Sequence, residues 1–172
     1  MYQELTGTWI VLLSSANYTR LELPQFLGWI GYSAMPADYD GDLLADPGVY
    51  QRENGDWRVM LSSANYYTIE VLGLLGGTGY WPVAADYDGD HKADPAVYGE
   101  TTGDWKVMLS SAEYWVLTLV NFLGGTGYIP VPADYDGDGL ADPAVRSETG
   151  NEWIVMFSTG SYTPVFLTIP FD

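Results

Sequence analysis

The chain has 172 residues, of which 47% are apolar and 15% aromatic, which is enough for one folded domain with a sizeable core. Six basic residues oppose 23 acidic ones, and the net charge of −17 makes nucleic acid and anionic membranes poor partners. The absence of cysteine excludes disulfides and thiolate metal sites, and no apolar run approaches the length of a membrane-spanning segment.

The sequence repeats itself with a period of 48 residues, a property typical of repeat architectures. Four tryptophans keep this spacing, and so do three acidic segments. The tryptophans are Trp9, Trp57, Trp105 and Trp153, and the acidic segments begin at Asp38, Asp86 and Asp134. We expect one repeat domain, 1–172, which divides in loop register into a partial unit 1–37 and the units 38–85, 86–133 and 134–172.

Each full unit predicts four short strands, named A to D in chain order, and the chain begins inside a strand B. In the clearest unit, strand A covers 80–85, strand B lies around 96–98, strand C covers 105–110 and strand D covers 114–121. Short runs rich in Val, Tyr, Trp and Thr between Gly, Asp, Ser or Pro are typical of strands. The triplet Ser-Ser-Ala at 110–112, with its copies, predicts the turn between C and D. No helical period persists, so almost no helix is expected.

Four strands in each 48-residue unit predict an all-β fold, a β-propeller built from four-stranded blades with about 3.5 repeats in the chain. A β-solenoid is the alternative, but its rungs are shorter, at roughly 20–30 residues. The strict period disfavours an immunoglobulin-like sandwich. Because a lone arc of blades would expose the apolar faces at its two ends, we expect a homo-oligomer, with a dimer favoured, to complete the ring.

An acidic loop joins strands A and B in each unit, with carboxylates at positions 1, 3, 5 and 9. Such carboxylates can point inward around a hard cation, and the carbonyl at position 7 would add an oxygen. Six to eight oxygens at about 2.3–2.6 Å suit Ca²⁺, whereas zinc or copper would require His or Cys. We therefore expect about three Ca²⁺ ions per chain. The predicted ligands are Asp38, Asp40, Asp42, Leu44 and Asp46; Asp86, Asp88, Asp90, Lys92 and Asp94; and Asp134, Asp136, Asp138, Leu140 and Asp142, with Leu and Lys acting through their carbonyls.

The loop differs from an EF-hand, because position 12 is a valine at the start of a strand and not a glutamate. Position 6 is Leu43, His91 or Gly139 in the three copies. If this position requires a positive φ, Leu43 is strained there, and the third site is expected to be at least as tight as the first. His91, the single histidine, is interpreted as a solvated loop residue.

These residues carry a family resemblance. The loop DYDGDGLADPAV (134–145), preceded by GGTGYIPVPA (124–133), resembles the FG-GAP/VCBS-type repeat, the calcium-loop propeller repeat of integrin α-subunit heads and of many bacterial secreted proteins. The resemblance covers essentially the whole chain and implies Ca²⁺ bound by the twelve aspartates named above. The Phe-Gly dipeptide is missing and the first copy reads WIGYSAMPA (29–37), which favours a bacterial-type repeat over an integrin.

The sequence favours a calcium-binding propeller that acts outside the cell or at its surface as an interaction, adhesion or structural module, because such loops saturate near millimolar calcium. No signal peptide is visible, so an exported protein would be represented here by a mature fragment or an excised piece. With one histidine and no cysteine, no catalytic constellation is visible and an enzyme is not expected. One alternative is a carbohydrate-binding lectin that stacks sugars on Trp29, Trp81 and Trp115. The other is an excised or engineered propeller fragment that self-assembles. The ligand would be a protein or a glycan.

Overall fold

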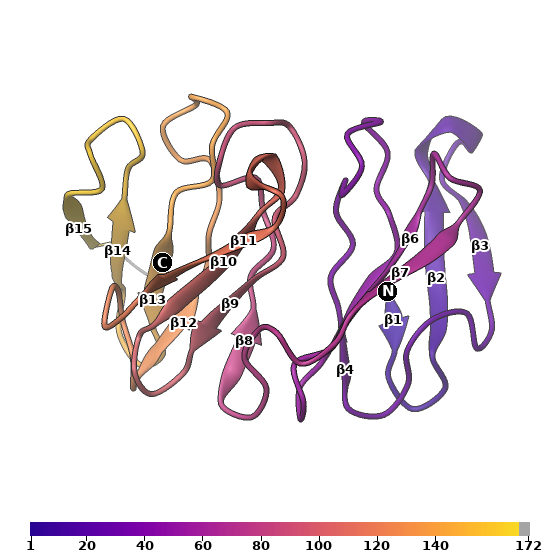
Figure 1. The fold of residues 1–172 in the computed structure, drawn as a ribbon, viewed down its shortest axis with the longest axis horizontal. Coiled ribbons are helices and arrows are strands. Elements are labelled where there is room, and N and C mark those ends of the chain that lie inside the picture. Colours follow the sequence, from indigo (N-terminus) through magenta and orange to yellow (C-terminus); the bar gives the residue numbers. More distant parts are fainter. Residues whose placement is uncertain (169–172) are drawn as a thin grey trace.

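The computed structural model describes residues 1–168 as a row of four antiparallel β-sheets, with the first and last sheets at opposite ends of the long axis (Figure 1). Three sheets have four strands and the first has three, and within each sheet the strands that are consecutive in sequence are hydrogen-bonded neighbours. The predicted all-β propeller built from four-stranded blades is confirmed. The only helices in residues 1–168 are the 3₁₀ turns η1 (Ser14–Ala16) and η2 (Ser110–Ala112), and neither is long and apolar enough to cross a membrane.

The strands recur in the same order in every blade. The first blade consists of β1 (Tyr2–Gln3), β2 (Thr8–Leu13) and β3 (Thr19–Leu23). The second consists of β4 (Tyr32–Ala34), β5 (Gly48–Gln51), β6 (Trp57–Leu61) and β7 (Tyr67–Val71). The third consists of β8 (Tyr80–Pro82), β9 (Ala96–Gly99), β10 (Trp105–Leu109) and β11 (Trp115–Leu119). The fourth consists of β12 (Tyr128–Pro130), β13 (Ala144–Ser147), β14 (Glu152–Met156) and β15 (Pro164–Thr168).

Strand A is shorter than predicted, because β8 ends at Pro82 whereas the sequence favoured 80–85. Proline has no N–H to donate, and it interrupts the regular ladder at this position. Pairing resumes only in part beyond it, where the Val83 amide donates to the Ala96 carbonyl at 2.8 Å and Ala85 forms an isolated bridge with Asp94. The acidic loop therefore begins soon after Pro82, and the Ala85–Asp94 bridge holds the two ends of the loop together.

The core lies between the blades, in three clusters that each join consecutive sheets. The cluster between the third and fourth blades contains Trp105 and Val107 of β10 together with Ile154 and Met156 of β14. Met108, the neighbour of Val107 in β10, belongs instead to the cluster shared with the second blade. Strand C therefore presents alternate residues to opposite neighbours, as the period of two along a strand requires. One blade cannot bury both of its faces alone, so each depends on the blades beside it.

Candidate metal centres

Each acidic loop connects strand A to strand B and is held at its base by one isolated β-bridge, a single pair of residues joined through the backbone. The pair joins an alanine before the loop to the aspartate at loop position 9. The three pairs are Ala37 with Asp46, Ala85 with Asp94, and Ala133 with Asp142. The bridge therefore fixes the two ends of each loop beside each other on the sheet.

Three aspartates converge in every loop, and the three clusters could hold metal ions. In each cluster, one carboxylate oxygen from each of the three aspartates lies within 4.8 Å of those from the other two. Oxygens that share a calcium ion at 2.3–2.6 Å can be separated by at most about 5.2 Å, so this spacing fits a hard cation. The clusters are Asp38, Asp40 and Asp42; Asp86, Asp88 and Asp90; and Asp134, Asp136 and Asp142.

Three of the predicted aspartate ligands lie outside these clusters: Asp46, Asp94 and Asp138. Asp46 and Asp94 are fully buried, and each uses its carboxylate to accept two backbone bonds. Asp94 accepts from Tyr87 N at 2.9 Å and from Ser110 N at 2.7 Å, which ties the start of the loop to the end of strand C. Position 9 therefore closes the loop in the second and third blades.

The fourth blade differs at loop positions 5 and 9, because Asp138 lies outside its cluster and Asp142 lies within it. Asp142 accepts the equivalent bonds, from Tyr135 N at 2.9 Å and from Ser158 N at 2.8 Å, and still lies within the cluster. The participation of the position 7 carbonyls stays a prediction. At that position the Leu44 amide donates to Asp42 Oδ1 at 2.8 Å.

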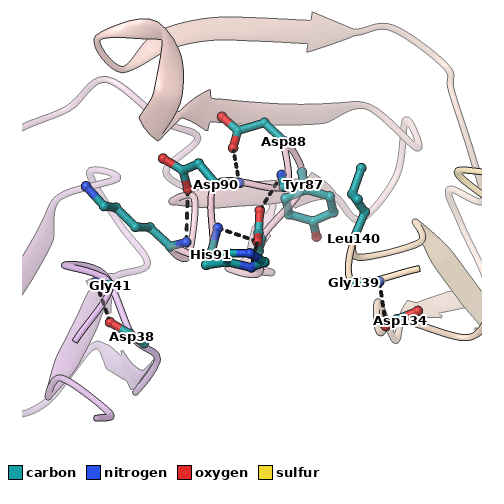
Figure 2. A network of polar contacts seen from close by, with 12 residues as sticks. Asp38, Gly41, Tyr87, Asp88, Asp90, His91, Asp134, Gly139 and Leu140 are labelled. Atoms are coloured by element: carbon teal, nitrogen blue, oxygen red, sulfur yellow. Dashed lines mark hydrogen bonds and ion pairs between the residues drawn. The ribbon is translucent and has the colours of Figure 1, made fainter. Parts of the chain in front are cut away.

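The first aspartate of each loop is oriented by backbone amides. Asp86 accepts from Gly89 N at 2.7 Å and from His91 N at 2.9 Å, and Figure 2 shows Asp38 with Gly41 and Asp134 with Gly139 in the neighbouring loops. In Asp86 and Asp134 these bonds use one lone pair per oxygen and leave others for a cation, whereas Asp38 Oδ1 also accepts from Asp42 N at 3.2 Å. The imidazole of His91 is 81% exposed, in agreement with its interpretation as a solvated residue.

Loop position 6 adopts a positive φ in all three copies, as the sequence suggested. The angle is 69° at Leu43, 67° at His91 and 94° at Gly139. This left-handed conformation brings the position 6 amide back to the first carboxylate. For a residue with a Cβ it is unfavourable by about 1–2 kcal/mol. The first two loops therefore carry strain that the third avoids.

Hydroxyl groups from the turn between strands C and D reach the carboxylates at loop position 3, and the sequence reasoning missed them. Ser63 Oγ donates to Asp40 Oδ2 at 2.7 Å, and Ser111 Oγ makes the same bond to Asp88. A signal was present, because the Ser-Ser-Ala triplet shares the 48-residue period of the loop. The turn follows the loop by about twenty residues, however, and only the pairing of strands B, C and D brings the two together.

Hydrogen bonding and burial set the charge states of the carboxylates in opposite directions. The bond from Ser63, helped by the Lys92 ammonium of the next loop, lowers the pKa of Asp40. Burial raises the pKa of Asp94 to about 6, although bonds from Ser110 and Tyr87 oppose the shift. Burial also raises the pKa of the Tyr87 hydroxyl. A buried carboxylate whose charge is disfavoured by its surroundings gains from a nearby cation.

The three predicted ligand-binding tryptophans are exposed, and two of them lie on different strands of the third blade. Trp29, Trp81 and Trp115 are 59%, 50% and 61% exposed. Trp81 borders an open cavity of about 280 Å³ that is also lined by Arg52 and Glu100. Trp115 lies on the outer strand β11 and Trp81 on the inner strand β8, so these two do not form one platform.

Comparison with known proteins leaves the geometry of the chain as the basis for a function. No family model, curated protein or solved structure matches the chain. The likeness to FG-GAP/VCBS repeats therefore rests on the motif residues themselves.

Proposed function

We propose that the chain is a calcium-binding β-propeller, in which one ion in each acidic loop stabilises a module for interaction or adhesion outside the cell. The observation that carries this proposal is the convergence of three carboxylates within 4.8 Å in each of three loops. Every protein ligand in the clusters is an oxygen, which favours Ca²⁺, and Mg²⁺ is less suited because it demands strict octahedral geometry. The resemblance to calcium-loop propeller repeats supports the same ion.

The ion would act structurally. Two carboxylates about 4 Å apart repel by about 1 kcal/mol in water and about 4 kcal/mol near a protein surface, and each cluster has three such pairs. A divalent ion turns this repulsion into attraction. Because Asp40 also accepts a bond from Ser63 in the turn after strand C, an ion held by Asp40 connects strands A, B and C of one blade.

The proposed location outside the cell follows from the calcium affinity expected of such loops, and the proposed type of partner follows from the net charge of the chain. Calcium loops in extracellular modules commonly work at dissociation constants of about 10⁻⁴–10⁻³ M, a range that matches the medium outside the cell. Three bound ions would change the net charge of −17 by +6, to −11. A strongly acidic surface favours basic or neutral partners, and we infer a protein or glycan ligand.

Calcium titration by calorimetry tests the proposal, with the metal-free protein prepared by chelation. We expect about three ions per chain and a melting temperature that falls substantially on addition of EDTA. Asp88→Asn should remove one ion, whereas Glu100→Gln, which removes the same charge from an exposed residue outside the loops, should leave the stoichiometry unchanged. An unchanged melting curve on verified metal-free protein, or equal stoichiometry in Asp88→Asn and the parent, would contradict it.

A second candidate is glycan binding at Trp81, favoured by the cavity beside its half-exposed indole. Aromatic faces stack on the apolar faces of sugars, and Arg52 and Glu100 supply a donor and an acceptor at the rim. Tryptophan fluorescence during titration with a panel of sugars tests this idea. Quenching that disappears in Trp81→Ala but persists in Trp115→Ala would support it, and no response across the panel would remove it.

A further inference from the structure

The two ends of the row of blades expose surfaces that are buried everywhere else in it. The tyrosine at loop position 2 packs edge-on against the strand C tryptophan of its own blade, with ring centroids 6.3–6.5 Å apart. Tyr39 and Tyr87, which the following blade covers, are 4% and 9% exposed. Tyr135, in the last blade, makes the same pair with Trp153 but is 41% exposed. We call this surface, formed by Tyr135, Trp153, Val165 and Leu167, the C-terminal face.

The first blade shows the complementary exposure. Met108 and Met156, which face the preceding blade, are 4% and 8% exposed. The equivalent residue of the first blade, 96 residues before Met108, is Leu12, and it is 58% exposed. Tyr18 is 68% exposed, against 44% for its equivalent Tyr114. We call the surface formed by Met1, Ile10, Leu12 and Tyr18 the N-terminal face.

We propose that the C-terminal face of one copy binds the N-terminal face of a second copy, head to tail. The pairing is already present inside the chain, where it recurs at each junction between blades. At the junction of the second and third blades, Met108 and Tyr114 border an apolar hollow with Tyr39 and Trp57. In the proposed contact, Leu12 and Tyr18 of one copy take the places of Met108 and Tyr114, to which they are equivalent in the repeat. They pack against Tyr135 and Trp153 of the other copy, which are equivalent to Tyr39 and Trp57.

The chemistry of the two faces fits this arrangement. On the C-terminal face, Trp153 pairs with Leu167 and Val155 with Val165, so both of these pairs between β14 and β15 are apolar, while Arg146 of β13 lies opposite Trp153 on its other side. On the N-terminal face, Arg20 of β3 lies opposite Leu12, and its guanidinium forms an ion pair with Glu22 at 2.7 Å. Arg20 and Glu22 therefore neutralise each other on this face, and the Met1 ammonium of the same face donates to the Ile10 carbonyl at 2.7 Å.

Head-to-tail contact also explains why association would stop at two copies. A contact between two different faces gives a closed ring when the rotation returns to the start, and an open fibre when it does not. Each copy contributes four blades, and two copies give 4 + 4 = 8, within the four to eight blades that closed propellers contain. A two-copy ring uses the same contact twice and leaves neither face exposed.

Sedimentation equilibrium of the chain in calcium-containing buffer is the first test. One chain has a mass of 19.0 kDa, so the expected species is 2 × 19.0 = 38.0 kDa. Leu12→Glu should give a monomer, because the new carboxylate would be buried against Trp153. Leu72 is the matched control, because it is 59% exposed yet lies outside both faces, and Leu72→Glu should keep the parental mass. A monomeric parent, or equal masses for the two variants, overturns the proposal.

Mixing two variants separates a head-to-tail contact from a symmetric one. Leu12→Glu blocks the N-terminal face and Leu167→Glu blocks the C-terminal face, so each variant alone should be a monomer. Mixed in equal amounts, they still offer one intact face each and should form a heterodimer of about 38 kDa. Both leucines are exposed in the single chain, so circular dichroism should show parental β-structure in each variant. A mixture that stays monomeric, or one variant that still dimerises alone, overturns the head-to-tail contact.

Discussion

The backbone carbonyl of Asp86 accepts a hydrogen bond from the amide of Ala141 at 2.6 Å, and the two residues belong to acidic loops of different blades. The Asp38 carbonyl accepts the same bond from Ala93, also at 2.6 Å. Asp86 contributes its side chain to one cluster, and Ala141 is followed by Asp142, which contributes to the next. The candidate metal sites are therefore connected in series by the backbone, and a displacement of one loop acts directly on its neighbour.

Ala141→Pro tests this connection, because it removes the N–H that joins the last two loops. We expect a loss of at least about 1 kcal/mol in the free energy of unfolding, measured by urea denaturation. The amide of Ala45, the equivalent residue in the first loop, donates no hydrogen bond within residues 1–168, so Ala45→Pro should have a much smaller effect. Ala141→Val adds volume but keeps the N–H and serves as the size control. Equal losses in the two proline variants would show that the inter-loop bond contributes nothing.

Leu43→Gly should stabilise the protein although it deletes an apolar side chain. Leu43 has a φ of 69° and is 85% exposed, so the substitution removes backbone strain and almost no packing. After the greater entropy of glycine in the unfolded chain is subtracted, we expect a gain of about 0.5–1 kcal/mol. The adjacent Leu44 is also exposed but is outside the positive-φ region, so Leu44→Gly should destabilise by a similar amount. Thermal melts of both variants decide the matter, and loss of stability in Leu43→Gly would contradict the strain argument.

The metal-free protein should lose stability as the pH rises through about 6. The pKa of Asp94 is raised to about 6 from its ordinary value of 3.8 by burial, so the folded state holds the proton more tightly than the unfolded state does. This contribution is fully present below about 3.8 and disappears above about 6, and 2.2 pKa units correspond to at most about 3 kcal/mol. The measurement is urea denaturation in chelator at several pH values between about 5 and 7.

Calcium should remove that trend, because a bound cation offsets the charge that burial disfavours. The comparison with calcium is therefore the control for the pH series. The range should stay above about pH 5, because Asp40 and Asp138 have lowered pKa values and lose their favourable hydrogen bonds to the charged form in more acidic buffer. A free energy of unfolding that rises with pH in chelator would refute the assignment to Asp94.

Trp105→Ala should destabilise by about 3–5 kcal/mol, because the side chain is completely buried in the cluster between the third and fourth blades. Trp115→Ala, in the adjacent strand of the same blade, removes an indole that is 61% exposed and should change stability by no more than about 0.5 kcal/mol. Denaturation of the two variants side by side distinguishes periodic from non-periodic tryptophans. Similar losses would contradict the assignment of the 48-residue tryptophans to the core.

The 48-residue period of the sequence and its glycine-rich turns were sufficient to predict the strands and blades. Tryptophans at a fixed spacing and glycine-rich turns are local features, and Trp105, for example, lies at the start of β10 as expected. The positive φ at Leu43 could also be anticipated, because the equivalent residue of the third loop is glycine. These predictions needed only comparison of one repeat with another.

The details of the candidate sites depend on contacts between distant segments and could not be predicted in the same way. Four carboxylates at a regular spacing appear equivalent in sequence, but Asp94 lies outside its cluster, whereas Asp142, which accepts the equivalent amide bonds, lies within its own. The bond from Ser63 to Asp40 requires the exact pairing of three strands. The link from Ala141 to Asp86 requires the stacking of two blades. Such features arise from tertiary packing, which a single repeat does not contain.

The uninterrupted order of strands within each blade has consequences for folding and for the gain or loss of whole repeats. No blade borrows a strand from another in residues 1–168, so an in-frame duplication or deletion of one unit would change only the length of the array. The same locality lets each blade begin to form as soon as it leaves the ribosome. The disadvantage is that the second and third blades have similar sequences. The edge of one can therefore pair with a strand of the other during folding, and such swapped intermediates should slow refolding.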